Sequence, residues 1–301
     1  MFEKNHSLGG NKMENTITGH TRLAALFATP IRHSVSPMIH NTAFQTLEID
    51  AVYLAFEVGT DGLKQAIDSI KNLDMIGANL SMPNKILAVE YMDELSEAAR
   101  LIGAVNTITN DHGKLTGHNT DGTGFMRSLQ DIEVDIIGKK MTIIGAGGAA
   151  TAIIVQAALD GVKEITVYNR KDDFYEKIKE KLAYISENTN CAITLNDLSD
   201  EHSLAKDVAE SALLLNATGV GMKPLENQTP IQDFSIIRSD LAVCDVIYTP
   251  RETEFLKQAR LRGAKTNNGL GMLLYQGAAA FEKWTGQEMP IEIVKPIIEN
   301  N

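Results

Sequence analysis

Lys85 ends the segment NLSMPNK, residues 79–85, at a position where a lysine is unusual. The apolar residues up to Leu80 predict a buried strand, and Pro83 ends it, so Lys85 falls where the next helix should begin. A helix start acts as a partial positive charge and disfavours a cation. Lys85 is therefore either a solvated surface lysine or a lysine held there to keep and hand over a proton.

Further polar side chains follow predicted strands in the first half of the chain. Ser34 and Ser36 lie in PIRHSVSP, Asn106 lies in GAVNT, and Asp121 lies in GHNTDGTGF. Ligands of open α/β sheets collect at the carboxyl ends of strands, so these loops could converge on one site. Each residue also has an ordinary structural interpretation, because Ser36 and Asp121 can cap helices and Asn106 can belong to a turn.

The segment GAGGAA, residues 145–150, fits the pattern G-x-G-x-x-G/A with Ala150 in the third place. Gly145 permits a tight turn, and Gly147 lets a pyrophosphate approach the backbone at a helix start. An apolar strand precedes the segment, a long apolar helix follows it, and a second strand ends at Asn169. This context favours dinucleotide binding over simple packing of a helix on a sheet.

The end of that second strand reads NRKDD, residues 169–173, without the usual acidic residue at its last position. Arg170 and Lys171 could hold a 2′-phosphate, whereas Asp172 could accept a hydrogen bond from a free ribose 2′-OH. A solvated loop of mixed charge is the alternative. The mixture predicts a site that tolerates both NAD and NADP.

Short apolar runs alternate with amphipathic stretches from residue 22 onward. This order predicts an α/β protein of two domains, each with a mainly parallel sheet, the C-terminal one a Rossmann-type doubly wound sheet. We expect a substrate-binding domain at 13–123, completed by 271–301, and an NAD(P)-binding domain at 124–270. The expected strands are 22–28, 51–58, 77–81, 139–144, 164–169, 212–218 and 241–249, with a hairpin at 105–120 and helices at 36–48, 61–73 and 124–138.

Composition limits the classes of partner. Lys and Arg total 28 against 39 Asp and Glu, and the net charge of −11 disfavours nucleic acid and anionic membranes. A local site can still bind an anionic small molecule. Cys191 and Cys244 are read as reduced thiols of a cytoplasmic protein. Cys/His clusters with metal-ligand spacing are missing, so no metal is predicted. Residues 1–12 are expected to be a disordered leader, and no membrane segment is predicted.

Seven segments occur in an order that resembles shikimate dehydrogenases, over nearly the whole chain after about residue 20. The segment NRKDD, with MPNK and KPLEN, is similar to the quinate/shikimate branch, which accepts either cofactor. Ser81 stands where the family commonly has threonine, and Arg-Thr normally follows the position of Asn169. The seven segments are PIRHSVSPMIHN, NLSMPNK, GAVNT, HNTDGTGF, GAGGAA, NATGVGM and GLGMLLYQGAAAFEKWTG.

The resemblance implies an NAD(P)-dependent oxidoreductase that reversibly transfers a hydride at a ring hydroxyl of shikimate or quinate. It implies that Lys85 and Asp121 share a proton beside the reacting oxygen, and which of them transfers it stays open. Ser34 and Ser36 would bind the substrate carboxylate. A hydroxylated ring needs several fixed donors and acceptors. Asn79, Ser81, Asn106, Asp121 and Gln276 would bind its hydroxyls, with Tyr53 contributing from the second strand.

The same resemblance implies the cofactor site, and Gln276 implies that the C-terminal helix returns to the first domain. Another Rossmann dehydrogenase, such as a methylenetetrahydrofolate dehydrogenase, and a non-catalytic dinucleotide sensor are the alternatives. A homodimer is compatible with the sequence. The implied cofactor residues are Gly145, Ala146, Gly147, Gly148, Ala149, Asn169, Arg170, Lys171, Asp172, Thr218, Gly219, Val220, Met222, Lys223, Val246, Tyr248, Gly269 and Met272.

Overall fold

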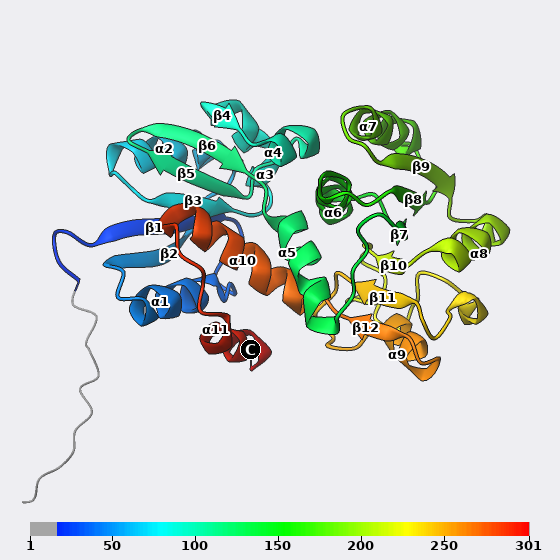
Figure 1. Cartoon of the computed structure of the whole chain (residues 1–301). Helices are drawn as coiled ribbons and strands as arrows, with labels where there is room; N and C mark the ends of the chain where they lie inside the picture. The colour runs from blue at the N-terminus through cyan, green and yellow to red at the C-terminus, as the bar shows by residue number, and fades with distance from the viewer. Residues whose placement is uncertain (1–16, 301) are drawn as a thin grey trace, which may run out of the picture.

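Two six-stranded sheets lie side by side in the computed structural model, which describes residues 17–300 (Figure 1). Helices α5 (Asp121–Ser128) and α10 (Leu270–Thr285) run between them. The α/β fold class with two sheets is confirmed. The leader predicted at 1–12 lies outside the described residues.

The first sheet has the order β2-β1-β3-β5-β6-β4 and is mixed. β1 pairs in parallel with β2 and β3, whereas β5 is antiparallel to both β3 and β6. The hairpin turns at His112 and Gly113, which both have positive φ, as a tight hairpin turn requires. Its elements are β1 (Arg22–Ala28), α1 (Ser36–Thr46), β2 (Ala51–Glu57), α2 (Thr60–Asn72), β3 (Gly77–Leu80), α3 (Asn84–Leu87), β4 (Glu94–Leu95), α4 (Glu97–Ile102), β5 (Thr107–Asp111) and β6 (Lys114–His118).

The second sheet has the order β12-β11-β10-β7-β8-β9, and every pair in it is parallel. The strand order reverses between β7 and β10, which is where doubly wound sheets bind nucleotides. Its elements are β7 (Lys140–Ile144), α6 (Gly148–Asp160), β8 (Glu164–Asn169), α7 (Tyr175–Glu187), β9 (Ala192–Asp197), α8 (Glu201–Glu210), β10 (Leu213–Asn216), β11 (Ala242–Asp245), α9 (Glu254–Leu261) and β12 (Lys265–Asn267).

Glycines let α5 pack closely between α6 and α10. A Cβ atom on Gly122 would collide with the backbone oxygen of Ala152 in α6, and one on Gly124 would lie 2.6 Å from the oxygen of Met272 in α10. These contacts explain why glycine occupies both positions in the segment TDGTGF. The packing fixes the N-terminus of α5, where Asp121 is the first residue.

The C-terminal helices pack against the first sheet. Leu274 and Phe281 of α10 share a buried apolar cluster with Ala24 of β1 and Phe44 of α1, and Val294 of α11 (Ile291–Glu299) joins it. The chain therefore returns to the first sheet after completing the second (Figure 1). In the described part of the chain, no helix combines the length and the apolar character needed to cross a membrane.

Three local predictions differ from the structure. The helix expected at 124–138 begins earlier, at Asp121, and gives way after Ser128 to a 3₁₀ turn that Glu133 ends with φ +53°. The strand expected at 241–249 stops at Asp245, where the chain turns toward the cavity described below. Ser36 does not cap α1, because Val35 occupies the N-cap position and no side chain caps that helix.

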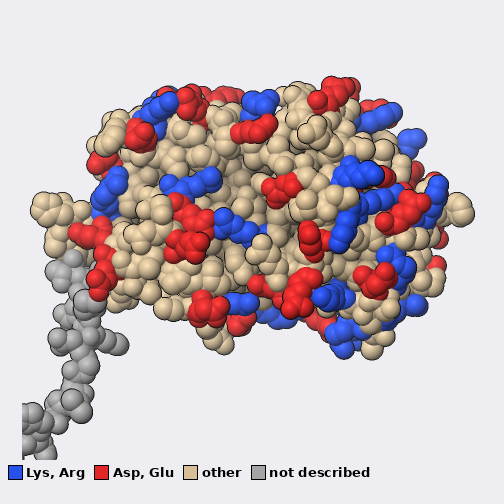
Figure 2. Space-filling view, viewed as in Figure 1, with Lys and Arg blue, Asp and Glu red and all other residues tan. Residues whose placement is uncertain are grey.

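Both cysteines are buried and free. Burial raises the pKa of the Cys191 thiol to about 11 and also raises that of Cys244. Both therefore stay protonated and inert at neutral pH. On the face shown in Figure 2, acidic and basic side chains are interspersed rather than gathered into patches of one sign.

Candidate active site

A cavity of about 550 Å³ is lined by residues from both halves of the fold. Because β5 runs antiparallel to β3, Thr107 begins β5 at the edge where Leu80 ends β3, and β6 ends at the same edge with His118. This edge delivers the polar segments to the cavity. From the predicted catalytic and substrate residues, the lining contains Ser34, Ser36, Asn79, Ser81, Lys85, Asn106, Asp121 and Gln276; from the predicted cofactor residues it contains Ala149, Val246, Tyr248, Gly269 and Met272.

Lys85 and Asp121 meet in this lining, although they are 36 residues apart in sequence. The Lys85 Nζ atom lies 2.6 Å from Oδ2 of Asp121, and the side chains are 22% and 17% exposed. The other oxygen of Asp121 accepts a hydrogen bond of 2.8 Å from the amide of Asn106. The carboxylate is thus held on both oxygens beside a cavity, and the pair can exchange a proton with a ligand there.

The position of Lys85 is set by the fully buried Asn84. The Asn84 side-chain amide donates to the backbone oxygens of Phe27 and Val58, at 3.1 and 2.8 Å, and so ties α3 to the ends of β1 and β2. The backbone oxygen of Lys85 accepts from Val105 N at 2.8 Å. Because α3 has only four residues, few peptide dipoles align behind the lysine, and the expected penalty for a cation is small.

Asn106 is a support for Asp121 rather than a free ligand group. Its side-chain nitrogen donates to Asp121 and Thr120, and its side-chain oxygen accepts from the hydroxyl of Thr107 and the backbone nitrogen of Thr120. Asn106 is 2% exposed. A buried amide with all its partners present has one orientation only, so Asn106 aims its N–H at the carboxylate.

Asn79 is held in the same way. Its side-chain nitrogen donates to Thr107 Oγ1 at 3.1 Å and to the backbone oxygen of Asn106 at 3.2 Å. Its side-chain oxygen accepts from the Tyr53 hydroxyl at 2.8 Å. Thr107 and Thr120, which sequence reasoning did not single out, therefore connect Asn79 to Asp121. Thr107 lies in the quoted segment GAVNT and Thr120 in HNTDGTGF, and this was the only sequence signal that could have indicated them.

Tyr53, which is predicted to contribute to substrate binding from the second strand, is not among the residues that line the cavity. It is fully buried, and burial raises the pKa of its hydroxyl. Its ring stacks on His40 with the centroids 4.4 Å apart, and burial lowers the pKa of His40 to about 3, so this imidazole is neutral. The Tyr53 hydroxyl donates to Asn79 and so fixes the orientation of the Asn79 side chain.

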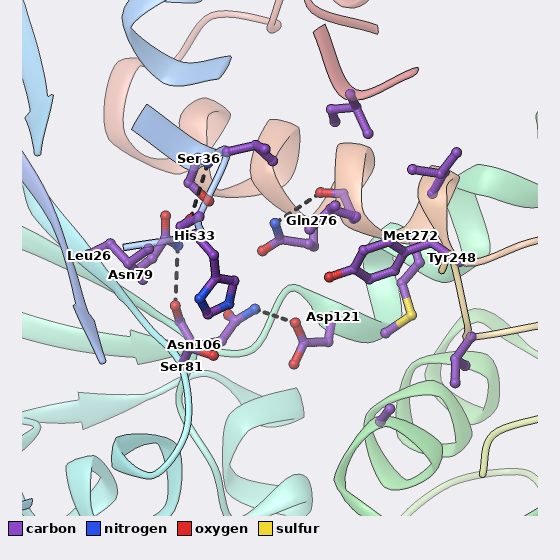
Figure 3. Close-up of a pocket in the computed structure, with 18 of the residues that line it drawn as sticks. Leu26, His33, Ser36, Asn79, Ser81, Asn106, Asp121, Tyr248, Met272 and Gln276 are labelled. Carbon is purple, nitrogen blue, oxygen red and sulfur yellow. Dashed lines mark hydrogen bonds between the residues drawn. The ribbon is translucent and has the colours of Figure 1, made fainter. Parts of the chain in front are cut away.

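The remaining substrate-side residues surround the same space. Ser36 N donates to Ser34 Oγ at 3.2 Å, which shapes the loop before α1. Figure 3 shows His33 and Gln276 facing the space beside Asp121, with Tyr248 and Met272 on the opposite side. His33 was missed, although it lies between the quoted proline and serine of PIRHSVSP. The lining also contains Arg251, which no sequence motif indicated.

The glycine-rich turn fits a bound dinucleotide. Gly145 has φ +103°, and a Cβ there would lie 2.8 Å from Thr218, so only glycine is tolerated. A Cβ on Gly147 or Gly148 would meet nothing within 4 Å, which leaves open space at the start of α6. The first N–H groups of a helix suit a pyrophosphate. The residues present therefore fit NAD(P), with the turn at its phosphates.

The predicted cofactor residues outside the cavity lie at the ends of the neighbouring strands. Asn169 ends β8, and Arg170, Lys171 and Asp172 follow it in exposed positions. One oxygen of Asp172 accepts from Phe174 N at 3.0 Å. At the end of β10, Thr218 and Gly219 begin the loop that continues through Val220, Met222 and Lys223.

That loop is organised by Asn216 and Asp245, which are neighbours on β10 and β11. Asn216 begins the quoted segment NATGVGM, whereas sequence reasoning missed Asp245. Asn216 donates to both oxygens of Asp245 at 3.2 Å and to Val220 O at 3.0 Å. Asp245 also accepts from Thr253 Oγ1 at 2.9 Å. Burial raises the pKa of Asp245 to about 6. In residues 17–300, no group of three or more His, Cys, Asp or Glu residues could hold a metal ion.

A doubly wound sheet with a glycine-rich turn, facing a polar cavity with a Lys–Asp pair, defines a two-sheet, dinucleotide-dependent oxidoreductase. Comparison with known families agrees. A model described as the shikimate dehydrogenase substrate binding domain matches residues 26–108, and one described as the shikimate 5′-dehydrogenase C-terminal domain matches residues 269–298.

Individual relatives match nearly the whole chain. A shikimate dehydrogenase (NADP(+)) of Listeria innocua is 54% identical over 288 residues, covering 96% of this chain and 99% of the relative. The crystal structure of shikimate 5-dehydrogenase from Listeria monocytogenes in complex with shikimate and NAD has a TM-score of 0.92 at 54% identity, covering 96% of this chain and 100% of that one. A shikimate dehydrogenase in complex with NADP+ has a TM-score of 0.84 at 39% identity, covering 95% and 97%. This chain belongs to the shikimate dehydrogenase family.

Proposed function

We propose that this enzyme reversibly oxidises a ring hydroxyl of shikimate with NADP+ or NAD+, a step of the shikimate pathway. The observation that carries the proposal is the Lys85–Asp121 pair, which lines a cavity together with Ser34, Ser36 and Gln276. The names of the relatives support shikimate as the first substrate to test. We assign substrate binding to residues 13–123 and 271–301, and cofactor binding to residues 124–270.

In this mechanism, the Lys85–Asp121 pair takes the proton of the substrate hydroxyl as the oxidation proceeds. Bound NAD(P) supplies the hydride acceptor, or the hydride donor in the reverse direction. On reduction, the same pair returns the proton to the developing alkoxide, a contribution of about 10²–10⁴-fold. Asn106 keeps Asp121 in place throughout, because its amide is fixed by Thr107 and Thr120.

The substrate carboxylate would meet the hydroxyls of Ser34 and Ser36 near the start of α1. The side-chain N–H groups of Asn79 and Asn106 already donate to protein acceptors. Their part in binding is therefore to hold neighbouring groups in place rather than to donate to the ring. Gln276 and Ser81 line the cavity and are the candidates for direct contact with ring hydroxyls.

Quinate is the second candidate substrate, and NAD+ the second cofactor. The sequence NRKDD at the end of β8 favours the use of both cofactors, because it lacks the Arg-Thr usual in the family and offers both cations and Asp172. Arg170 and Lys171 would hold a 2′-phosphate, and Asp172 would accept from a 2′-OH.

Initial rates with shikimate and quinate, each with NAD+ and NADP+, test the proposal. We expect turnover with shikimate and at least one cofactor. Absence of reduction in all four mixtures would reject the proposed function, and cofactor binding without turnover would favour a dinucleotide sensor. Turnover with a folate substrate only would favour a methylenetetrahydrofolate dehydrogenase.

We also propose a cytoplasmic homodimer. Two buried free thiols support a reducing compartment. Among the described residues, β2 is an edge strand, and it exposes Leu54 and Phe56. An apolar sheet edge is a surface that a second copy can cover. Sedimentation analysis of the wild type and of Phe56→Lys tests this: we expect a dimer that the substitution weakens.

A further inference from the structure

Arg251 is a cavity-lining cation that the proposed function leaves without a role. It lies in the loop between β11 and α9, on the side of the second sheet. Its Nη2 atom donates to the backbone oxygens of Ile298 and Glu299, at 3.0 and 3.1 Å, in the last turn of α11. Its own backbone oxygen accepts from Asn268 at 2.8 Å. Arg251 therefore links the second sheet to the helix that packs on the first.

The carbonyls that hold Arg251 place it toward the end of the cavity where Ser34 and Ser36 lie. Ile298 lines the cavity and shares a buried cluster with Ile31 and Ile39, which flank the loop with the two serines. Helix α11 also packs directly on α1, the helix that begins at Ser36. This end of the cavity is where the substrate carboxylate is expected.

The charge of Arg251 is not neutralised by a carboxylate within residues 17–300. Its side-chain partners there are the two carbonyls, which use one nitrogen of the guanidinium and leave N–H groups on the other two. The other fixed cation of the lining, Lys85, is paired with Asp121. In a chain of net charge −11, a guanidinium without a carboxylate partner in the described residues, in the same cavity lining as the hydroxyls of Ser34 and Ser36, favours an anion in that cavity.

We propose that Arg251 is a further substrate-binding residue, which binds the carboxylate of the substrate from the side of the second sheet while α11 holds it in place. This inference rests on the proposed function and names the residue that makes the cavity selective for an anionic ring over a neutral one. A bound carboxylate then also links the two halves of the cavity, since Arg251 belongs to the half with the second sheet and Ser36 to the half with the first.

Calorimetric titration of shikimate and of neutral shikimate methyl ester tests the proposal, with NADPH present because it cannot accept a hydride. We expect Arg251→Gln to weaken shikimate binding about tenfold, the value of one charge-assisted hydrogen bond, and methyl ester binding less than twofold. Arg251→Lys keeps the charge and should recover part of the affinity for shikimate.

Arg238→Gln is the matched control. Arg238 also donates to carbonyls at the end of a helix, Val208 O at 2.7 Å and Ser211 O at 3.0 Å after α8, but it does not line the cavity. We expect it to lower stability and leave both affinities unchanged.

The role of Arg251 would be overturned by equal weakening of the two ligands in Arg251→Gln, by unchanged binding of shikimate, or by no recovery in Arg251→Lys. Loss of NADPH affinity alone would assign Arg251 to the cofactor and overturn it as well. Turnover of the wild type with shikimate is measured separately, so a failure of the proposed function is recognised independently.

Discussion

On the side of the first sheet, the polar residues of the cavity are tied to one another by buried hydrogen bonds, whereas on the side of the second sheet the residues that we propose to select the cofactor are exposed. Tyr53, Asn79, Thr107 and Asn106 form one continuous network that ends at Asp121. Arg170, Lys171 and Asp172 stand at the end of β8 in water.

This difference indicates how substitutions on each side should affect stability, rate and cofactor preference. A buried network has one arrangement, so a substitution in it disturbs several groups at once and costs both stability and rate. Exposed residues contribute little to stability, so substitution at the end of β8 can alter cofactor preference without disturbing the fold. We therefore expect effects to fall from the Lys85–Asp121 pair outward to Asp172.

The largest effect should follow removal of the ammonium group. We expect Lys85→Ala to lower kcat by about 10²–10⁴-fold and to leave substrate affinity nearly unchanged, because the group acts on the proton in transit. Steady-state kinetics measure the split between kcat and KM. Lys64→Ala is the control, since Lys64 makes a similar 2.7 Å ion pair with Asp68 on an exposed helix face. Normal turnover of Lys85→Ala would remove Lys85 from the mechanism.

Asp245, like its partner Asn216, is buried on the side of the second sheet. Burial raises its pKa from 3.8 to about 6, so the folded state binds this proton more tightly than the unfolded state does. Stability from this group is therefore fully present below about pH 4 and is lost as pH rises to about 6, by up to about 3 kcal/mol.

Asp245→Asn removes this titration. We expect the free energy of unfolding of the wild type, relative to the variant, to fall between pH 4.5 and 6.5 and to level off above. Urea denaturation at four pH values measures this difference in the free energy of unfolding. Asp173→Asn, at an exposed position, is the control and should give a difference that does not change with pH. A difference that is constant with pH would contradict the role of burial at Asp245.

Thr107 tests the buried network directly. Thr107→Val removes the hydroxyl that donates to Asn106 and accepts from Asn79, so one buried N–H of Asn79 loses its acceptor and the Asn106 oxygen loses one of its donors. We expect a loss of about 1–3 kcal/mol in stability and a lower kcat, because Asn106 no longer has a single orientation toward Asp121. Thr107→Ser keeps the hydroxyl and should restore both. If the valine variant keeps its melting temperature and kcat, the network does not position Asp121.

The smallest effect is expected at the end of β8. Asp172→Ala should raise the KM for NAD+ about two- to tenfold, the value of one hydrogen bond, and change the KM for NADP+ less. Asp173→Ala is the matched neighbour and should change neither. Equal effects of Asp172→Ala on both cofactors would refute the role of Asp172 and weaken the contrast between the two sides.

Local patterns predicted the fold well where neighbouring residues decide the structure. The strand at 164–169 has the predicted bounds, and the glycine turn at 145–148 has the expected open geometry. Prediction was poorer where a distant contact decides. Helix α5 starts at Asp121, where Gly122 and Gly124 let α6 and α10 approach closely, and the local sequence does not show that these helices pack there.

The site shows the same limit. Segment order and residue type indicated Lys85, Asp121 and the two serines. Tyr53 was predicted to contribute to substrate binding, and only the packed structure shows that its buried hydroxyl donates to Asn79. The local sequence did not show what the side chains of Asn84 and Arg251 do, since the groups to which they donate lie at least 26 residues away.

By itself, the sequence determined the strands, the turns and the nucleotide-binding glycines, because these depend on backbone sterics and on the periodicity of apolar residues within a short window. The tertiary structure alone brought Nζ of Lys85 within 2.6 Å of Asp121 and Arg251 against the last turn of α11. Such contacts join segments that are remote in the chain, so they arise only when the sheets and the helices between them have packed.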